Sequence, residues 1–298
     1  MRYAVAKGTL RLNRMMHGLF VGLTTLDLIY QVMEQPQPNQ KLVALDYTMS
    51  AGGPATNAAV AFGALGGRAS LLSVVGCHPM TQLIKADVQQ CGVSLRDLDP
   101  AWVESPSVSS IIVTKATGDR AVISINAVKL QATAAQIPAN ILQGVDIVLL
   151  DGHQIPVGSA IAQQANVRNI PVVLDGGSWK PGLETVLPLV NYAICSANFH
   201  PPNCTTQADV VAYLTDSGIA HIAITQGEQP IWYGDHAAIG TIPVPKIQPV
   251  DTLGAGDIFH GAFCYFILQT NFVEALEKAA EVAARSCLSF GTRQWMKQ

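Results

Sequence analysis

Short apolar runs that alternate with helical patterns are the feature that most restricts how this chain can fold. Four of the runs are rich in Val, Ile and Leu and show no polar alternation: residues 145–152, 170–177, 192–198 and 219–227. Strands of that composition are buried on both faces, as in a parallel sheet covered by helices. Helical patterns near 156–168 and 206–217 fall between them. The alternation predicts an α/β fold of three layers, α/β/α, with a mostly parallel sheet in the middle.

The composition narrows the class of function. With 49% hydrophobic and 13% charged residues, the 298-residue chain can bury a large core. Its formal net charge of −3 gives no basic face for nucleic acid, and its apolar stretches are interrupted before the ~18 residues of a membrane span. Six scattered cysteines without a C-x-x-C pair are typical of reduced thiols in a cytoplasmic protein. We therefore expect small-molecule chemistry, with no nucleic-acid or membrane partner.

The chain divides into an extension, a main domain and an inserted lid. Residues 1–16 carry four basic residues, no acidic one and no cleavage signal, and we expect a disordered extension there. Residues 17–298 form the domain. Two stretches of the domain, about 28–50 and 105–127, depart from the strand–helix alternation. They are rich in β-branched residues and turn signals, and the second contains the hairpin turn ATGDR. We expect these stretches to form a small β-strand lid that closes over a crevice.

The stretch VDTLGAGDIFHGAF at 250–263 carries the first candidate site. Gly254, Ala255 and Gly256 precede an apolar helical pattern, and such small residues allow backbone N–H groups to converge at a helix N-terminus that attracts anions. Asp257 follows at once, beside any anion held there. It either caps the helix or accepts a proton from a hydroxyl that attacks a bound phosphoryl group.

Two stretches resemble the signatures of one family. DTLGAGD at 251–257 is similar to the C-terminal signature D-T-x-G-A-G-D of the ribokinase-like carbohydrate kinases, also called the phosphofructokinase-B family. AGGPATNAAVAFGALGG at 51–67 resembles the family's N-terminal signature, about two hundred residues earlier. The resemblance covers residues 17–293 and implies a ribokinase-like core with a small lid.

The resemblance implies an ATP-dependent sugar kinase that transfers the γ-phosphoryl group to a sugar hydroxyl. Asp257 is then the general base, while the N–H groups of Ala255, Gly256 and Asp257, with Gly254 shaping the turn, hold the phosphoryl group. Sugar contacts are implied for Asp27, in a polar turn after the first strand, and for Gly52, Gly53 and Asn57. Without the family match, the two glycines are turn residues and Asn57 is an ordinary residue at a helix start.

Nucleotide contacts follow from the same resemblance, with two departures. The implied residues are Thr225 and Gly227 in TQGEQP, Asn198 in ANFHP, and the small residues Ser286, Ser289 and Gly291 bordering the adenine. Pro230 stands where the family pattern T-x-G-x-x-G has its last glycine, and Pro201 where many relatives have a glutamate near magnesium. Mg²⁺ is still expected, held largely by phosphates and water.

Several charged residues have two readings. Asp251 matches the carboxylate that holds a monovalent cation such as K⁺ in relatives, and alternatively it ties its loop by accepting backbone N–H groups. Asp151 and Asp175 end strands, where ligands gather in α/β sheets. Arg120 and Lys180 could each hold an anionic group on the substrate, or simply be solvated.

Two rival functions remain open at this point. One is a nucleoside kinase of the same superfamily, and the other is a sugar- or nucleotide-binding regulator without catalysis, suggested by Pro201 and Pro230. The acceptor sugar is also open, because residues of the lid decide it. An exposed lid edge is compatible with a monomer or a homodimer.

Overall fold

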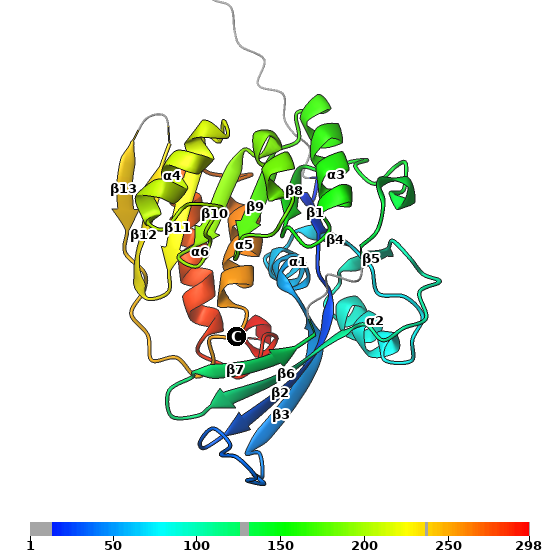
Figure 1. Cartoon of the computed structure of the whole chain (residues 1–298), viewed down its shortest axis with the longest axis vertical. Coiled ribbons are helices and arrows are strands. Elements are labelled where there is room, and N and C mark those ends of the chain that lie inside the picture. The colour runs from blue at the N-terminus through cyan, green and yellow to red at the C-terminus, as the bar shows by residue number, and fades with distance from the viewer. Residues whose placement is uncertain (1–13, 126–130, 236–237, 298) are drawn as a thin grey trace, which may run out of the picture.

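The computed structural model describes residues 14–125, 131–235 and 238–297. In these ranges the chain forms a nine-stranded sheet with helices on both faces and a separate four-stranded sheet at one end of it, as Figure 1 shows. Residues 1–13 of the expected extension and residues 126–127 of the expected lid lie outside the described ranges. The three-layer α/β architecture predicted from the alternating runs is confirmed.

The large sheet contains all four apolar runs as neighbouring strands. Its order is β13 (Ile239–Ile242), β12 (Gln229–Gly234), β11 (His221–Gln226), β10 (Tyr192–Ser196), β9 (Val172–Gly176), β8 (Ile147–Leu150), β1 (His17–Val21), β4 (Arg68–Ser73) and β5 (Ser94–Asp97). Pairing is parallel from β11 to β5, whereas β12 and β13 add an antiparallel edge. Strand β1 lies between β8 and β4, so the chain order reverses there and a crevice opens at the carboxyl ends.

Helices cover the large sheet on both faces. In Figure 1, α3 (Ile155–Val167) and α4 (Gln207–Asp216) lie in front, and α1 (Pro54–Ala64), α5 (Ala255–Phe266) and α6 (Phe272–Ser286) lie behind. One cluster of buried apolar side chains fills each interface. Helix α2 (Thr81–Gln90) packs beside β5 and the four-stranded sheet. Of the helices in the described ranges, none has the length and apolar character needed to cross a membrane.

The four-stranded sheet, called the small sheet below, is built from the two stretches expected to form a lid. Its order is β3 (Asp46–Gly52), β2 (Thr25–Val32), β6 (Ser107–Thr114) and β7 (Arg120–Ser124). Asp27 is the third residue of β2, so its placement in a turn after the first strand was wrong. The strand extends back to Thr25 because Thr25 and Asp27 pair with both β3 and β6.

Helices α1 and α5 approach each other closely because α5 has a glycine at their contact. A methyl group at Gly261 would lie 2.2 Å from the backbone carbonyl oxygen of Ala58 in α1. The contact matters for function because α1 carries Asn57 and α5 carries Asp257.

We predict that Gly261→Ala lowers the free energy of unfolding by about 1–3 kcal/mol, because the added methyl group must push α1 and α5 apart. Chemical denaturation followed by circular dichroism measures it. Gly63→Ala is the matched control, since a methyl group there meets its nearest atom at 3.8 Å, and helical alanine should leave stability equal or up to about 1 kcal/mol higher. Equal stability of the two variants would contradict the proposed close contact.

Candidate active site

A pocket of about 320 Å³ lies between the small sheet and the carboxyl ends of the large sheet. The small sheet contributes one face of alternating side chains: Thr25, Asp27, Ser109, Ile111, Val122 and Ser124. The larger body contributes Gly53, Asn57, His153, Leu253 and Asp257. The structure therefore brings three of the four expected sugar-contact residues and the expected base around one space.

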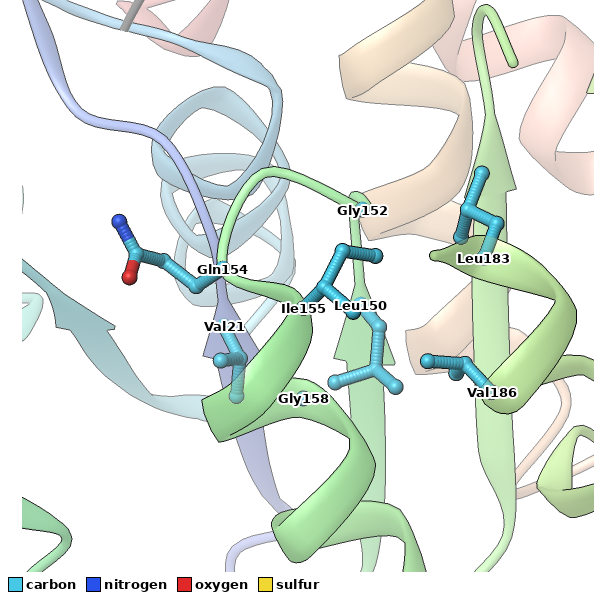
Figure 2. A pocket seen from close by; sticks show the side chains of 8 residues that line it. All are labelled: Val21, Leu150, Gly152, Gln154, Ile155, Gly158, Leu183 and Val186. Atoms are coloured by element: carbon cyan, nitrogen blue, oxygen red, sulfur yellow. The ribbon is translucent and has the colours of Figure 1, made fainter. Parts of the chain in front are cut away.

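A second, much smaller cavity lies between α3 and the end of β8, as Figure 2 shows. Its volume is about 10 Å³, and its lining is mainly aliphatic, including Val21, Leu150 and Leu183. That volume is enough for about one water molecule and excludes a sugar. The larger pocket is therefore the candidate substrate site.

Asp257 stands in the first turn of α5, where the backbone is shaped for an anion. Gly254 is the N-cap residue, with a φ of 71° that favours glycine. The first intrahelical bond runs from the Ile258 N–H to the Gly254 carbonyl (2.8 Å), so the N–H groups of the preceding residues lie before the helical ladder. A methyl group at Gly256 would meet no atom within 4 Å, which leaves open space in front of this turn.

One of the three expected donors at this turn already has an acceptor. The Ala255 N–H donates to the Thr252 carbonyl at 3.3 Å, which is a long hydrogen bond. The Asp257 carboxylate, by contrast, accepts a hydrogen bond from Asn57 Nδ2 at 2.8 Å. Among the described residues its donor thus comes from α1, and the helix-cap reading does not describe its contact.

The surroundings of Asp257 disfavour its negative charge. The pKa of Asp257 is raised to about 7, mainly by burial and also by the charges of Asp175 and Asp151, while the Asn57 hydrogen bond and His260 act in the opposite direction. Near neutral pH the carboxyl group is therefore present in both forms. A general base is most effective when its pKa lies near the working pH, and Asp257 meets that condition.

Asp175 and His260 form a buried pair beneath the same helix. His260 Nδ1 lies 3.4 Å from Asp175 Oδ2, and both side chains are about 5% exposed. The two ring nitrogens of His260 also face the Gly256 carbonyl (2.7 Å) and the Ile194 carbonyl (3.0 Å). The pair fixes the start of α5 to strands β9 and β10.

Asn57 is held from its other side by an arginine near the end of the chain. Arg293 Nη1 donates to Asn57 Oδ1 at 3.0 Å. The same guanidinium contacts the Asp87 carboxylate through Nε (3.3 Å) and Nη2 (3.1 Å), and it also donates to the Ala51 carbonyl. A continuous chain of polar contacts thus runs from α2 through Arg293 and Asn57 to Asp257.

Asp27 is a buried carboxylate on the inner face of the small sheet. Thr25 Oγ1 donates to Asp27 Oδ1 at 2.6 Å. Burial raises the pKa of Asp27, and hydrogen bonds from Thr25 and Ser109 partly oppose that shift. A methyl group at Gly52 would lie 1.9 Å from Asp27 Oδ2, so Gly52 is required by this carboxylate. Gly53 is required by its φ of 93° and by the Leu23 carbonyl, which a methyl group would approach to 2.4 Å.

Asp151 ties together the loops that form the pocket wall. Its Oδ2 accepts the N–H groups of Leu23 (2.8 Å) and Ala55 (3.2 Å), and its Oδ1 accepts that of His153 (2.9 Å). The contact with His153, together with these hydrogen bonds, lowers the pKa of Asp151 against the effect of burial. Asp151 is therefore an ionised structural anchor between β1, α1 and β8.

Comparison with known proteins agrees with this geometry. The family model described as pfkB family carbohydrate kinase matches residues 17–298. The chain is a pfkB family carbohydrate kinase. As a member of that family, it is a phosphotransferase with an alcohol group as acceptor.

Relatives and solved structures match nearly the whole kinase. The ribokinase of Bacillus subtilis is 25% identical over 93% of this chain and 94% of its own, and the deoxyribokinase of Salmonella typhi is 26% identical over 92% and 93%. A ribokinase-type structure from Agrobacterium tumefaciens covers 96% of this chain and 100% of its own at a TM-score of 0.83 and 23% identity. One from E. coli, in complex with ATP and Mg²⁺, covers 95% and 96% at 0.76 and 19%. The fold is thus ribokinase-like.

Three residues of this kinase expected near a nucleotide lie at the carboxyl ends of β10 and β11: Asn198, Thr225 and Gly227. The Ala197 N–H donates to the Thr225 carbonyl at 2.9 Å, which places the turn containing Asn198 beside Thr225. Gly227 has a φ of 62° in the tight turn to β12, and Pro230 lies on β12 opposite an irregular register. A proline at such an irregularity does not break the strand pairing.

The remaining expected nucleotide contacts lie at the end of α6 and just after it. Ser286 Oγ donates back to the Ala283 carbonyl (2.7 Å) and Ser289 Oγ to the Ser286 carbonyl (3.5 Å). Gly291 has a φ of 72°, and its N–H donates to Asp251 Oδ2 at 2.9 Å. Both serine hydroxyls thus donate to carbonyls of their own turn.

Asp251 joins two loops of the kinase. Its Oδ1 accepts the Leu253 N–H (2.9 Å), and its Oδ2 accepts the Gly291 N–H. Both oxygens therefore hold backbone N–H groups of the loops, which is the alternative to binding a cation. Beside it, Arg120 Nη1 reaches from β7 to Thr252, donating to the carbonyl (3.1 Å) and to Oγ1 (2.8 Å). Arg120 therefore links the small sheet to the loop before α5.

Some residues of the site were not identified from the sequence. Ser109 on β6 and Ser124 on β7 line the pocket, and the letters of β6, SVSSIIVT, gave no polar–apolar alternation to show which of its faces is buried. Arg293 had no signal, since a single arginine near a chain end carries no pattern. Its partners Asp87 and Asn57 are more than two hundred residues away.

We predict that Asp257→Asn stabilises the ligand-free kinase at pH 8. Because the folded-state pKa is raised, the favourable contribution of the protonated carboxyl group is complete near pH 4 and is lost as the pH rises through about 7. Asparagine removes that loss, which a pKa rise of about three units puts at up to about 4 kcal/mol, or up to roughly 10 °C in Tm.

Calorimetry from pH 5 to 8.5 without ligands checks this. The gap between Asp257→Asn and the wild type should widen as the pH rises and level off above about 7.5. Asp119→Asn, on an exposed turn, is the matched control and should show no such widening. A gap independent of pH would contradict the raised pKa.

Proposed function

We propose that this carbohydrate kinase transfers the γ-phosphoryl group of MgATP to a hydroxyl of a small uncharged sugar, with Asp257 as the general base. The observation that carries the proposal is the position of the Asp257 carboxylate. It lines the 320 Å³ pocket while standing in the first turn of α5, beside the open space at Gly256. A hydroxyl in the pocket and a phosphoryl group at the helix start would meet at this carboxylate.

In this proposal, the role of each group in phosphoryl transfer follows from its surroundings. Asp257 takes the hydroxyl proton as the oxygen attacks phosphorus, which the raised pKa favours. The N–H groups of Gly256 and Asp257, together with the helix dipole, stabilise the negative charge on the transferred group. Asp27, held by Thr25, accepts hydrogen bonds from sugar hydroxyls and orients the acceptor.

Mg²⁺ enters this proposal as part of the nucleotide. The described residues contain no group of three His, Cys, Asp or Glu side chains arranged for a metal ion. An open helix N-terminus fits phosphate, and Mg²⁺ binds through phosphate oxygens and water in many such sites. Bound there, the ion would neutralise phosphate charge, and Thr225, Gly227 and Asn198 are the residues proposed to face the nucleotide. K⁺ at Asp251 is not part of this proposal, because both carboxylate oxygens of Asp251 accept backbone N–H groups.

The pocket favours a small neutral acceptor. Its volume is at the lower end of the range for small-molecule sites. Among the described lining residues, His153 is the single one able to carry positive charge. Arg120 donates to Thr252, and Lys180 donates to the Ser178 carbonyl (3.1 Å), so the two cations considered for an anionic substrate are engaged elsewhere.

The small sheet acts as a lid that excludes water.

The acceptor class is tested by measuring ADP release with pentoses, hexoses, their phosphates and nucleosides. We expect unphosphorylated pentoses or hexoses to give kcat/KM at least tenfold above every phosphorylated sugar and nucleoside. A nucleoside preference would instead support the rival nucleoside kinase. Calorimetric binding of a sugar without ADP release would support a regulator.

We predict that Asp257→Asn lowers kcat by about 10²–10⁴, because the hydroxyl then loses its proton acceptor while the fold is preserved. Coupled ADP release measures kcat, and a melting curve confirms folding. Asp119→Asn serves as the matched control and should retain normal turnover. Near-normal turnover of Asp257→Asn would refute the assignment of the base.

A further inference from the structure

Arg293 is anchored so that its guanidinium has one fixed position. Its side chain is 16% exposed and forms an ion pair with Asp87, whose side chain is 19% exposed. Asp87 Oδ2 receives Nε and Nη2, and it also accepts the Ala51 N–H at 3.0 Å. Nη1 of Arg293 donates in addition to Thr292 Oγ1 at 3.0 Å. The guanidinium thus meets Asn57 as a rigid donor.

A rigid donor determines which end of the Asn57 amide faces Asp257. Guanidinium groups donate hydrogen bonds and never accept them, so the end of Asn57 toward Arg293 is its oxygen, Oδ1 (3.0 Å). The NH₂ end then faces Asp257 Oδ2 (2.8 Å). Without Arg293 the amide could turn over and present its oxygen to Asp257. A carboxyl group facing an acceptor must be protonated to form a hydrogen bond.

We propose that Arg293 is a positioning residue for catalysis: it fixes the Asn57 amide so that Asn57 donates to Asp257 and favours the ionised base. This inference rests on the proposed function, in which Asp257 takes the proton of the sugar hydroxyl. Arg293 itself touches neither substrate nor Asp257 and acts through Asn57. The ion pair with Asp87 supplies the second anchor, on α2.

The groups around Asp257 explain why the orientation of one amide matters. The charged or titratable side chains that act on its carboxyl group are Asp175 on β9, Asp151 after β8 and His260 on α5. His153 and Asp27 line the same pocket. Two of these neighbours are carboxylates that oppose ionisation of Asp257, and the amide of Asn57 counteracts them. If the amide were reversed, Asp257 would lose the hydrogen bond that favours its ionised form.

The test compares Arg293→Met with Arg293→Lys. We expect Arg293→Met to move the acidic limb of kcat/KM about one pH unit upward, giving about a tenfold loss at pH 6 and less than about threefold at pH 9.5. Arg293→Lys keeps a donor without acceptor capacity and should move the limb by less than about 0.3 units. Arg285→Met is the matched control from the same end of the chain, since Arg285 packs over Trp295 and should leave the limb unchanged.

A double-mutant cycle separates action through the amide from loss of a nearby charge. In an Asn57→Ala background, Arg293→Met should produce no further shift of the limb. A ¹³C NMR titration of the Asp257 carboxyl group in the ligand-free protein, assigned by its loss in Asp257→Asn, should show the same pattern without relying on turnover.

Several outcomes would overturn the inference. They are an equal loss of activity at every pH, a shift that persists without Asn57, or an unchanged NMR titration in Arg293→Met. If Arg293→Met does not fold, Arg293→Gln replaces it, because glutamine can accept as well as donate and should still shift the limb relative to Arg293→Lys. Normal turnover of Asp257→Asn would instead remove the proposed function, and the NMR titration would then still decide the role of Arg293.

Discussion

The hydrogen bond from Asn57 to Asp257 is the contact on which the rest of the site depends. It joins α1 to α5 across two hundred residues of sequence, and it favours the ionised form of a carboxyl group whose ionisation burial and two neighbouring carboxylates oppose. Two helices can make this bond only if their backbones approach closely, which Gly261 permits. Packing between helices and the protonation of one side chain are therefore parts of the same arrangement.

In the small sheet, too, a glycine leaves the room that a functional side chain needs. Asp27 can point into the pocket because Gly52, on the neighbouring strand, leaves the volume that its carboxylate occupies. Gly53 then turns the chain into α1, which delivers Asn57 four residues later. The two glycines that resemble a substrate-contact motif thus have a structural role of their own, which is to place a carboxylate from β2 and an amide from α1 around one pocket.

The sequence predicted the fold, and the structure places several of the residues expected in the site around one pocket, but the contacts between them were not predictable. Buried strands and amphipathic helices have periodicities that a single chain displays, so the parallel sheet, α3, α4 and α5 were predictable. Asp27 was misplaced in a turn because a single polar residue beside a glycine and threonines looks like a loop. Its strand is defined by pairing with β3 and β6, which are distant in sequence.

Arg293 marks the limit of prediction from sequence most clearly. Its importance comes from what surrounds it, a carboxylate on α2 and an amide on α1, and neither neighbour is encoded in its local pattern. An isolated arginine near a chain end is ordinarily solvated, yet here an ion pair and several backbone and side-chain acceptors hold it. The Asn57 amide can take two orientations. In the proposal, the residue that fixes its orientation determines whether Asn57 favours the protonated or the ionised form of Asp257. In the proposed mechanism, the protonation of the Asp257 carboxyl group is thus set by a cation that does not contact it.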